Sequence, residues 1–93
     1  AWLNLTGTGT IAIADSFNIS SVTDIATGAY SAAFTNAMSN ANYSAVASPR
    51  YPGFGAFQIA ICTGINTGSV NFNTQDLDNN AHDAHLHLAV FGD

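Results

Sequence analysis

The residues best suited to chemistry are two histidines near the end of the chain, His85 and His87, separated by one leucine. They fall in an alternating run that predicts a strand, and alternate residues of a strand project from the same face. Three copies of this strand around a three-fold axis would supply six imidazole nitrogens, an octahedral set suited to a first-row transition metal. The alternative is that both side chains face solvent or a subunit contact without a metal.

A second group surrounds the only cationic side chain, Arg50, which stands beside Tyr51 and Phe54 in a segment that contains both prolines. Prolines and glycines at this density predict a loop. Arginine and tyrosine dominate binding hot spots because each combines a large contact area with directional polar groups. We therefore expect Arg50, Tyr51 and Phe54 to contact a receptor. The alternative is that the prolines brace the loop while the aromatic rings pack on the core or on a neighbouring subunit.

The remaining combinations are incomplete. A calcium loop that began at Asp76 would need glycine in the sixth place and glutamate in the twelfth, where the chain has alanine and histidine. His82 and Asp83 could form part of a nucleophilic triad, but no Gly-x-Ser-x-Gly motif accompanies them. Cys62 ends an apolar run, where burial would leave its thiol inert. The sequence predicts that the chain is not an enzyme.

Composition narrows the choice of partners. Charged residues make up 8% of the chain, whereas an average soluble domain has about 25%. A net charge of −5 with one cation excludes most nucleic-acid and anionic-lipid binders. No run approaches the ~18 apolar residues of a membrane helix, so no membrane insertion is expected. The hydrophobic fraction of 47% predicts that some apolar surface lies between copies of the chain.

Short alternating runs and regular turn signals predict one domain over residues 1–93, an antiparallel β-sandwich (jelly-roll-like) of six to seven short strands. Bends are expected at 15–16 and 63–64, and polar loops at 36–42 and 74–83. The expected strands cover 11–13, 17–22, 30–34, 43–47, 57–62, 70–73 and 85–91.

Seven stretches carry a family resemblance: AWLN (1–4), GTGTIAI (7–13), DSFNISSVTD (15–24), TGAY (27–30), FTNAM (34–38), ANY (41–43) and LAVFG (88–92). In this order they resemble the short C-terminal domain of many phage and prophage tail-fibre-like proteins. They cover about half of the chain, and the middle, from about residue 49 to residue 84, matches no stated pattern.

The resemblance implies a trimeric β domain on the virion surface, outside the cell, at the C-terminal end of a longer fibre protein. The chain departs from the family where the segment before Tyr30 is less polar, and where His85 and His87 replace aliphatic or small residues. The His-x-His pattern is similar to rings that bind iron along the axis of some trimeric phage fibre and spike tips. By that likeness His85 and His87 would hold iron.

We expect a host-receptor adhesin that works by avidity, because three equivalent weak sites held rigidly multiply their affinity. Its partners would be two further copies of the chain, a host cell-surface glycan or protein, and other virion proteins. The alternative is a structural virion component, such as a head fibre, decoration or collar protein, that binds no receptor. Binding of isolated trimers to host cells separates the two.

Overall fold

A computed structural model describes residues 1–49, 58–76 and 80–92, and these residues form eight strands without helices. They confirm the all-β antiparallel sandwich and add one strand to the six or seven expected. No helix long and apolar enough to span a membrane occurs in this part of the chain. The strands are β1 (Trp2–Thr6), β2 (Ala12–Phe17), β3 (Ile19–Ala26), β4 (Ala29–Phe34), β5 (Ser44–Pro49), β6 (Gln58–Ile65), β7 (Ser69–Asp76) and β8 (Leu86–Phe91).

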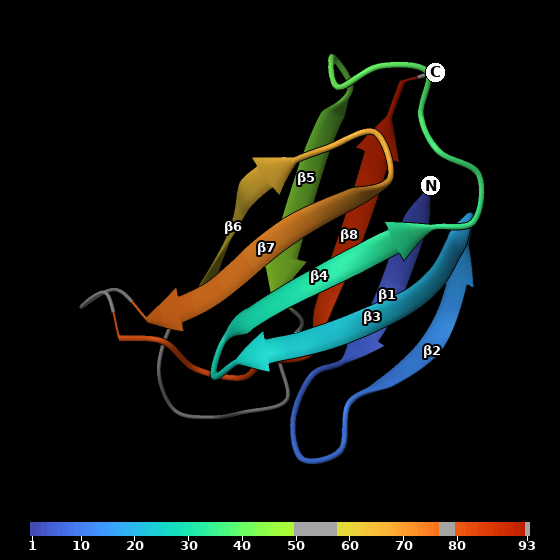
Figure 1. Cartoon of the computed structure of the whole chain (residues 1–93). Helices are drawn as coiled ribbons and strands as arrows, with labels where there is room; N and C mark the ends of the chain where they lie inside the picture. The colour runs from blue at the N-terminus through green and yellow to red at the C-terminus, as the bar shows by residue number, and fades with distance from the viewer. Residues whose placement is uncertain (50–57, 77–79, 93) are drawn as a thin grey trace.

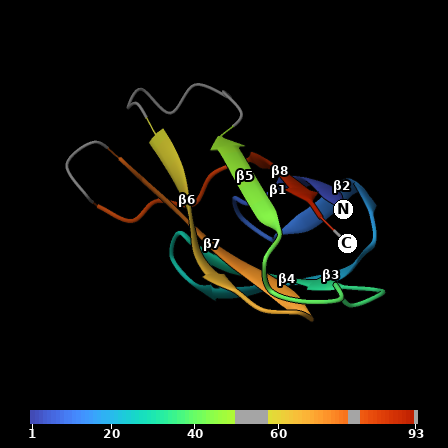
Figure 2. The ribbon, with the colours of Figure 1, turned by 90° about the horizontal axis from the view of Figure 1, so that it is seen from above.

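The strands form two four-stranded sheets that pack face to face (Figures 1 and 2). Sheet A has the order β2-β1-β8-β5, and sheet B has the order β3-β4-β7-β6. All neighbouring strands are antiparallel. Three pairs of consecutive strands, β1–β2, β3–β4 and β6–β7, form hairpins within one sheet. The path of the chain is therefore more local than the two Greek keys of a jelly roll.

Strict alternation of side chains explains why these segments form strands with one buried side. In β8, Leu86, Leu88 and Val90 are buried, while the residues between them face outward. The two central strands of sheet B alternate in the same way. Burying each large apolar side chain stabilises the fold by about 1.5–3 kcal/mol. The core contains Leu3, Leu5, Ile19, Tyr30, Ala32, Phe34, Met38, Tyr43, Val70, Phe72, Leu86, Leu88 and Val90.

The strand absent from the sequence prediction is β1, and it occupies a central position in sheet A. Leu3 and Leu5 point into the core, with exposed fractions of 1% and 0%. β1 pairs with β8 on one side, where the nitrogen of Val90 donates to the carbonyl oxygen of Ala1 at 2.8 Å. The start and the end of the chain therefore lie side by side in one sheet (Figure 2).

The bend expected at 15–16 is wrong, because both residues lie inside β2. The chain instead passes from sheet A to sheet B at Asn18, whose φ of 59° is a left-handed conformation that asparagine tolerates. Asn18 and Asn36 fix this corner with reciprocal bonds. The side-chain nitrogen of Asn18 donates to the carbonyl oxygen of Asn36 at 3.0 Å, and the backbone nitrogen of Asn36 donates to Oδ1 of Asn18 at 2.7 Å.

The turn expected at 63–64 is also displaced. β6 continues to Ile65, and an irregularity between Cys62 and Gly64 absorbs the extra residue as a bulge. The turn lies at 66–68, where the nitrogen of Asn66 donates to the carbonyl oxygen of Ser69 at 3.0 Å. The loop at 36–42 is confirmed, whereas the loop expected at 74–83 begins later because β7 extends to Asp76.

Candidate functional site

Of the two predicted histidines, His87 lies on the outer side of β8, and His85 directly precedes the strand. Leu86 and Leu88 point into the core, so the side chain of His87 between them faces outward, whereas His85 is half-buried. His87 is exposed, and its neighbours across the sheet are Asn4 of β1 and Ser48 of β5. That both imidazoles project from one face stays a prediction, because His85 precedes the strand and is half-buried.

One chain does not complete a metal site from the residues that the structure describes. No three histidine, cysteine, aspartate or glutamate side chains come close enough within residues 1–49, 58–76 and 80–92 to hold an ion. Three copies of His85 and His87 would complete an octahedral set only if both side chains faced a shared three-fold axis. Iron at this position stays a prediction.

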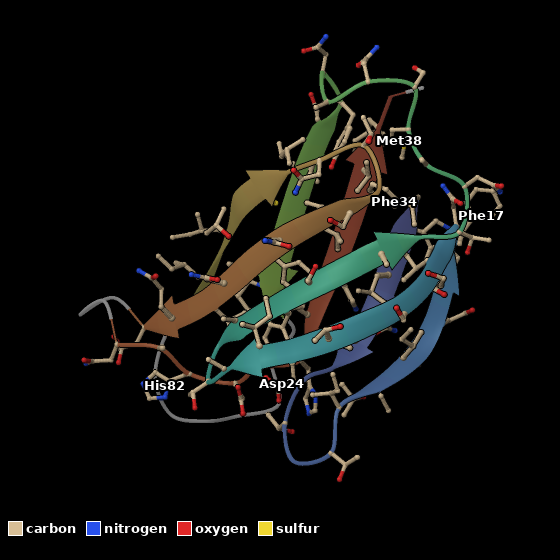
Figure 3. The ribbon with its side chains drawn as sticks, viewed as in Figure 1. Phe17, Asp24, Phe34, Met38 and His82 are labelled. Carbon is tan, nitrogen blue, oxygen red and sulfur yellow. The ribbon has the colours of Figure 1, made fainter. Side chains whose placement is uncertain are left out.

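The outer face of sheet A carries a row of apolar side chains across all four strands. The register places Phe17 beside Trp2, Trp2 beside Ala89, and Ala89 beside Val46. Trp2 is 44% exposed, Val46 58% and Phe17 63%, so none of the three is covered by its own fold. Figure 3 shows Phe17 at the end of β2, where the chain turns into β3. We call Phe17, Trp2, Ala89 and Val46 the aromatic row.

A polar row runs parallel to the aromatic row, at positions two residues away on each of the four strands. Asp15 pairs with Asn4, Asn4 with His87, and His87 with Ser48. The Oδ1 atom of Asn4 is buried and has no hydrogen-bond partner among the described residues. An unpaired buried acceptor costs about 1–3 kcal/mol. The polar row, Asp15, Asn4, His87 and Ser48, therefore contains one acceptor that the fold itself leaves unused.

A groove of about 430 Å³ lies between these two rows on the outer face. Its volume falls within the range of small-molecule sites, which is roughly 300–1,000 Å³. The groove forms because the small side chain of Ala89 is flanked by two larger ones, Trp2 and Val46, on neighbouring strands. The outward-facing side chains that line it are Trp2, Asn4, Val46, Ser48, His87 and Ala89.

The outer face of sheet B has a different chemistry. Its central strands present small polar side chains, with Ser31 paired to Asn71 and Ala29 to Asn73. Among the described residues of sheet B, large exposed apolar groups lie on the edge strands, where Ile59 and Ile61 of β6 are 37% and 40% exposed and Ile25 of β3 is 57% exposed. No aromatic side chain faces outward from β4 or β7, since Tyr30, Phe34 and Phe72 are all buried.

One end of the sandwich is held by a network around Asp83. Its Oδ1 atom accepts a hydrogen bond from the nitrogen of Gly28 at 2.8 Å and lies 3.1 Å from the hydroxyl of Tyr30. The same hydroxyl donates to the carbonyl oxygen of Gly7 at 2.7 Å. Burial, with a smaller effect from the Asp83 carboxylate, raises the pKa of Tyr30 to about 12. At Gly28, φ is +68° and a Cβ would lie 2.4 Å from the carbonyl oxygen of Thr74, so this turn requires glycine.

His82 and Asp83 face different partners, so they do not form the acid-base pair that their adjacency suggests. Nε2 of His82 lies 2.9 Å from Oδ2 of Asp76, at the end of the molecule seen in Figure 3, while Asp83 belongs to the network around Tyr30. Asp76 also accepts from the nitrogen of Asn80 at 2.9 Å. Cys62 is half-buried, and burial raises the pKa of its thiol, as expected for an unreactive side chain.

The predicted receptor-contact residues Arg50, Tyr51 and Phe54 lie outside the described residues. The residues that sequence reasoning missed are Trp2, Val46 and Asn4, because their common site depends on which strands pair. One signal was available, since Trp2 precedes an alternating Leu-Asn-Leu run that predicts an outward-facing tryptophan. No family model, curated protein or solved structure matches the chain.

Proposed function

We propose that the chain is a trimeric receptor-binding domain of a virion fibre, exposed outside the cell, that attaches to a host surface through the outer face of sheet A. The observation that carries the proposal is the aromatic row. Its exposed members, Trp2, Phe17 and Val46, stand on strands whose other sides complete the core. Exposed apolar patches bordered by polar residues mark interaction sites. The role is binding, without catalysis.

Avidity supplies the strength of attachment. A groove that is open to solvent and has few charges binds weakly when it acts alone. Three rigidly linked copies convert the second and third contacts into intramolecular events, which raises the overall affinity by about 10²–10⁴. The groove suits this mechanism because it is built on paired strands, which hold its side chains in fixed positions.

The subunit contact falls on the other sheet. Ile59 and Ile61 of edge strand β6 expose apolar surface on the outer face of sheet B, away from the groove. Contact between copies through this edge leaves all three grooves open to the host. We expect Ile61→Asp to lower the mass in solution from trimer to monomer, and to weaken cell binding without changing the groove.

The test is binding of the labelled protein to a panel of bacterial strains by flow cytometry, with the mass in solution measured on the same sample. We expect a trimer that labels some strains, and loss of labelling in Trp2→Ser. The matched control is Ser31→Ala, on the outer face of sheet B. A monomer that labels no strain would overturn the proposal.

The alternative function is that of a structural virion component, a head fibre, decoration or collar protein. The same aromatic row favours it, because apolar surface left open by one chain is often covered by another protein of an assembly. Under this alternative no strain is labelled. Trp2→Ser would then impair incorporation of the protein into particles instead of attachment to cells.

A further inference from the structure

Trp2 is held in place as one wall of the groove. β1 lies between β2 and β8, so the backbone of Trp2 is paired on both sides, with Phe17 and with Ala89. The nitrogen of Ala1 donates to the carbonyl oxygen of Val90 at 3.2 Å, which ties down the residue before it. An indole fixed in this way loses little conformational freedom when a ligand stacks on it.

The floor of the groove has the dimensions of a small flat ligand. Ala89 lies between Trp2 and Val46, whose strands are neighbours on either side of β8. Paired strands lie about 4.8 Å apart, so the two walls are roughly 10 Å apart. A single six-membered ring fits between them with one of its faces on the indole.

The polar end of the groove supplies both donors and acceptors. Ser48 has a hydroxyl and His87 has an imidazole, each able to donate and to accept. Asn4 also lines this end of the groove and carries a side-chain amide. The groove is therefore complementary to a ligand with one apolar face and several hydroxyls on its rim.

Charge decides among such ligands. Among the residues that the structure describes, the lining of the groove contains neither lysine nor arginine, and Asp15 stands at the end of the polar row. The whole chain has a net charge of −5. A ligand with a carboxylate, sulfate or phosphate would meet repulsion from Asp15 and from the net negative charge of the chain. These charges favour a neutral ligand.

We propose that the groove binds a neutral pyranose, with the apolar face of the sugar ring on the indole of Trp2 and its hydroxyls directed to Asn4, Ser48 and His87. This proposal rests on the proposed function and names the chemical class of its receptor, a neutral cell-surface glycan. Stacking on Trp2 supplies contact area, while the polar row selects the orientation of the hydroxyls.

Trp2 is the only tryptophan in the chain, so its fluorescence reports on the groove directly. The experiment titrates the trimer with glucose, galactose, mannose and N-acetylglucosamine, using sialic acid as the charged comparison. We expect at least one neutral sugar to change the Trp2 emission with a dissociation constant on the order of 1 mM, and sialic acid to leave it unchanged.

Two variants locate the site, and a third serves as the control. Ala89→Ile fills the floor with a residue that suits a strand, and we expect it to weaken sugar binding about 10-fold or more. Asn4→Ala should weaken binding while leaving the melting temperature unchanged or higher, since it removes an unpaired buried acceptor. Ser31→Ala lies on the outer face of sheet B, outside the groove, and should change binding less than about twofold.

The outcomes separate this proposal from the function on which it rests. If the trimer labels cells through Trp2 but no neutral sugar at about 100 mM changes the emission, the sugar proposal fails and the receptor is a protein. If the trimer neither labels cells nor responds to sugar, both proposals fail. Equal loss of sugar binding in Ala89→Ile and Ser31→Ala would also overturn the groove as the site.

Discussion

The two outer faces of the sandwich are built by the same backbone geometry and yet differ in chemistry. On sheet A the outward positions hold Trp2, Phe17 and Val46, whereas the central strands of sheet B present Ser31 and Asn71. Both faces alternate with buried residues, so the core imposes no requirement on either of them. The residue types at outward positions therefore reflect what the surface contacts, whereas those at inward positions reflect what the core requires.

The largest expected effect is on the free energy of unfolding, when variants on the inner and outer sides of one strand are compared. Leu88→Ala on the inner side of β8 should lower the free energy of unfolding by about 2–5 kcal/mol, because it leaves a cavity in the core. His87→Ala on the outer side should change it by about 0.5 kcal/mol or less. Urea denaturation measures both. Similar losses in the two variants would mean that the outer face is also packed.

The next effect compares the two sheets. Trp2→Ser should reduce the apparent affinity of the trimer for cells about 10-fold or more, because aromatic residues at the centre of a site dominate binding. Asn71→Ala on the outer face of sheet B should reduce it less than about twofold. Dose-response labelling of cells provides the measurement. If Asn71→Ala has the larger effect, sheet B is the receptor face.

A smaller effect is expected on stability, and it tests whether Tyr30 of sheet B contributes to the fold and not to binding. Tyr30→Phe removes the hydroxyl shared by Gly7 and Asp83, and should cost about 1–2 kcal/mol of stability. Cell binding should stay within about twofold of the unaltered protein, since Tyr30 lies in the core beneath the opposite sheet. A large loss of binding at unchanged stability would contradict this division of roles.

The pH dependence follows from the raised pKa of Tyr30. Because folding raises this pKa from 10.0 to about 12, the folded state favours the neutral hydroxyl. The corresponding stability is complete below pH 10 and is lost as the pH rises from 10 toward 12. The difference in melting temperature between the unaltered protein and Tyr30→Phe should shrink over that interval. A difference that stays constant from pH 9 to pH 12 would refute the assignment.

The smallest effect concerns the metal. If the outer face of sheet A is open for a receptor, His87 cannot lie on a three-fold axis, and EDTA should shift the melting temperature of the trimer by less than about 1 °C. Elemental analysis for iron, zinc and nickel on the same sample completes the test. One metal per three chains, with a large fall in melting temperature on chelation, would place sheet A at the centre of the trimer and close the groove.

The class of fold was predictable because it depends on local alternation, which the sequence displays. Leu86, Leu88 and Val90 at alternate positions predict a strand with one buried side whatever lies next to it. The same logic predicts an outward-facing His87 between two buried leucines. The bend at Asn18 was harder, since it depends on a distant partner, Asn36, that holds a left-handed residue in place.

The groove was not predictable for a different reason. Trp2, Val46 and Ala89 come from the beginning, middle and end of the chain, and they meet only because β8 inserts between β1 and β5. A pattern within one segment cannot give the register between distant strands. The sequence therefore drew attention to Arg50 and its neighbours, where residue types were distinctive, and away from a site made by pairing.

The position of β8 also has a consequence for how the domain is made. β8 follows the other seven described strands in the sequence, and it forms the middle of sheet A, between β1 and β5. During translation β1 therefore cannot pair with β8 until β8 has been synthesised, and contacts of such large sequence separation form slowly. Sheet B, by contrast, is complete once β7 has emerged. The groove can therefore assemble only after β8 has been synthesised, so a translation product interrupted before β8 has no groove to present.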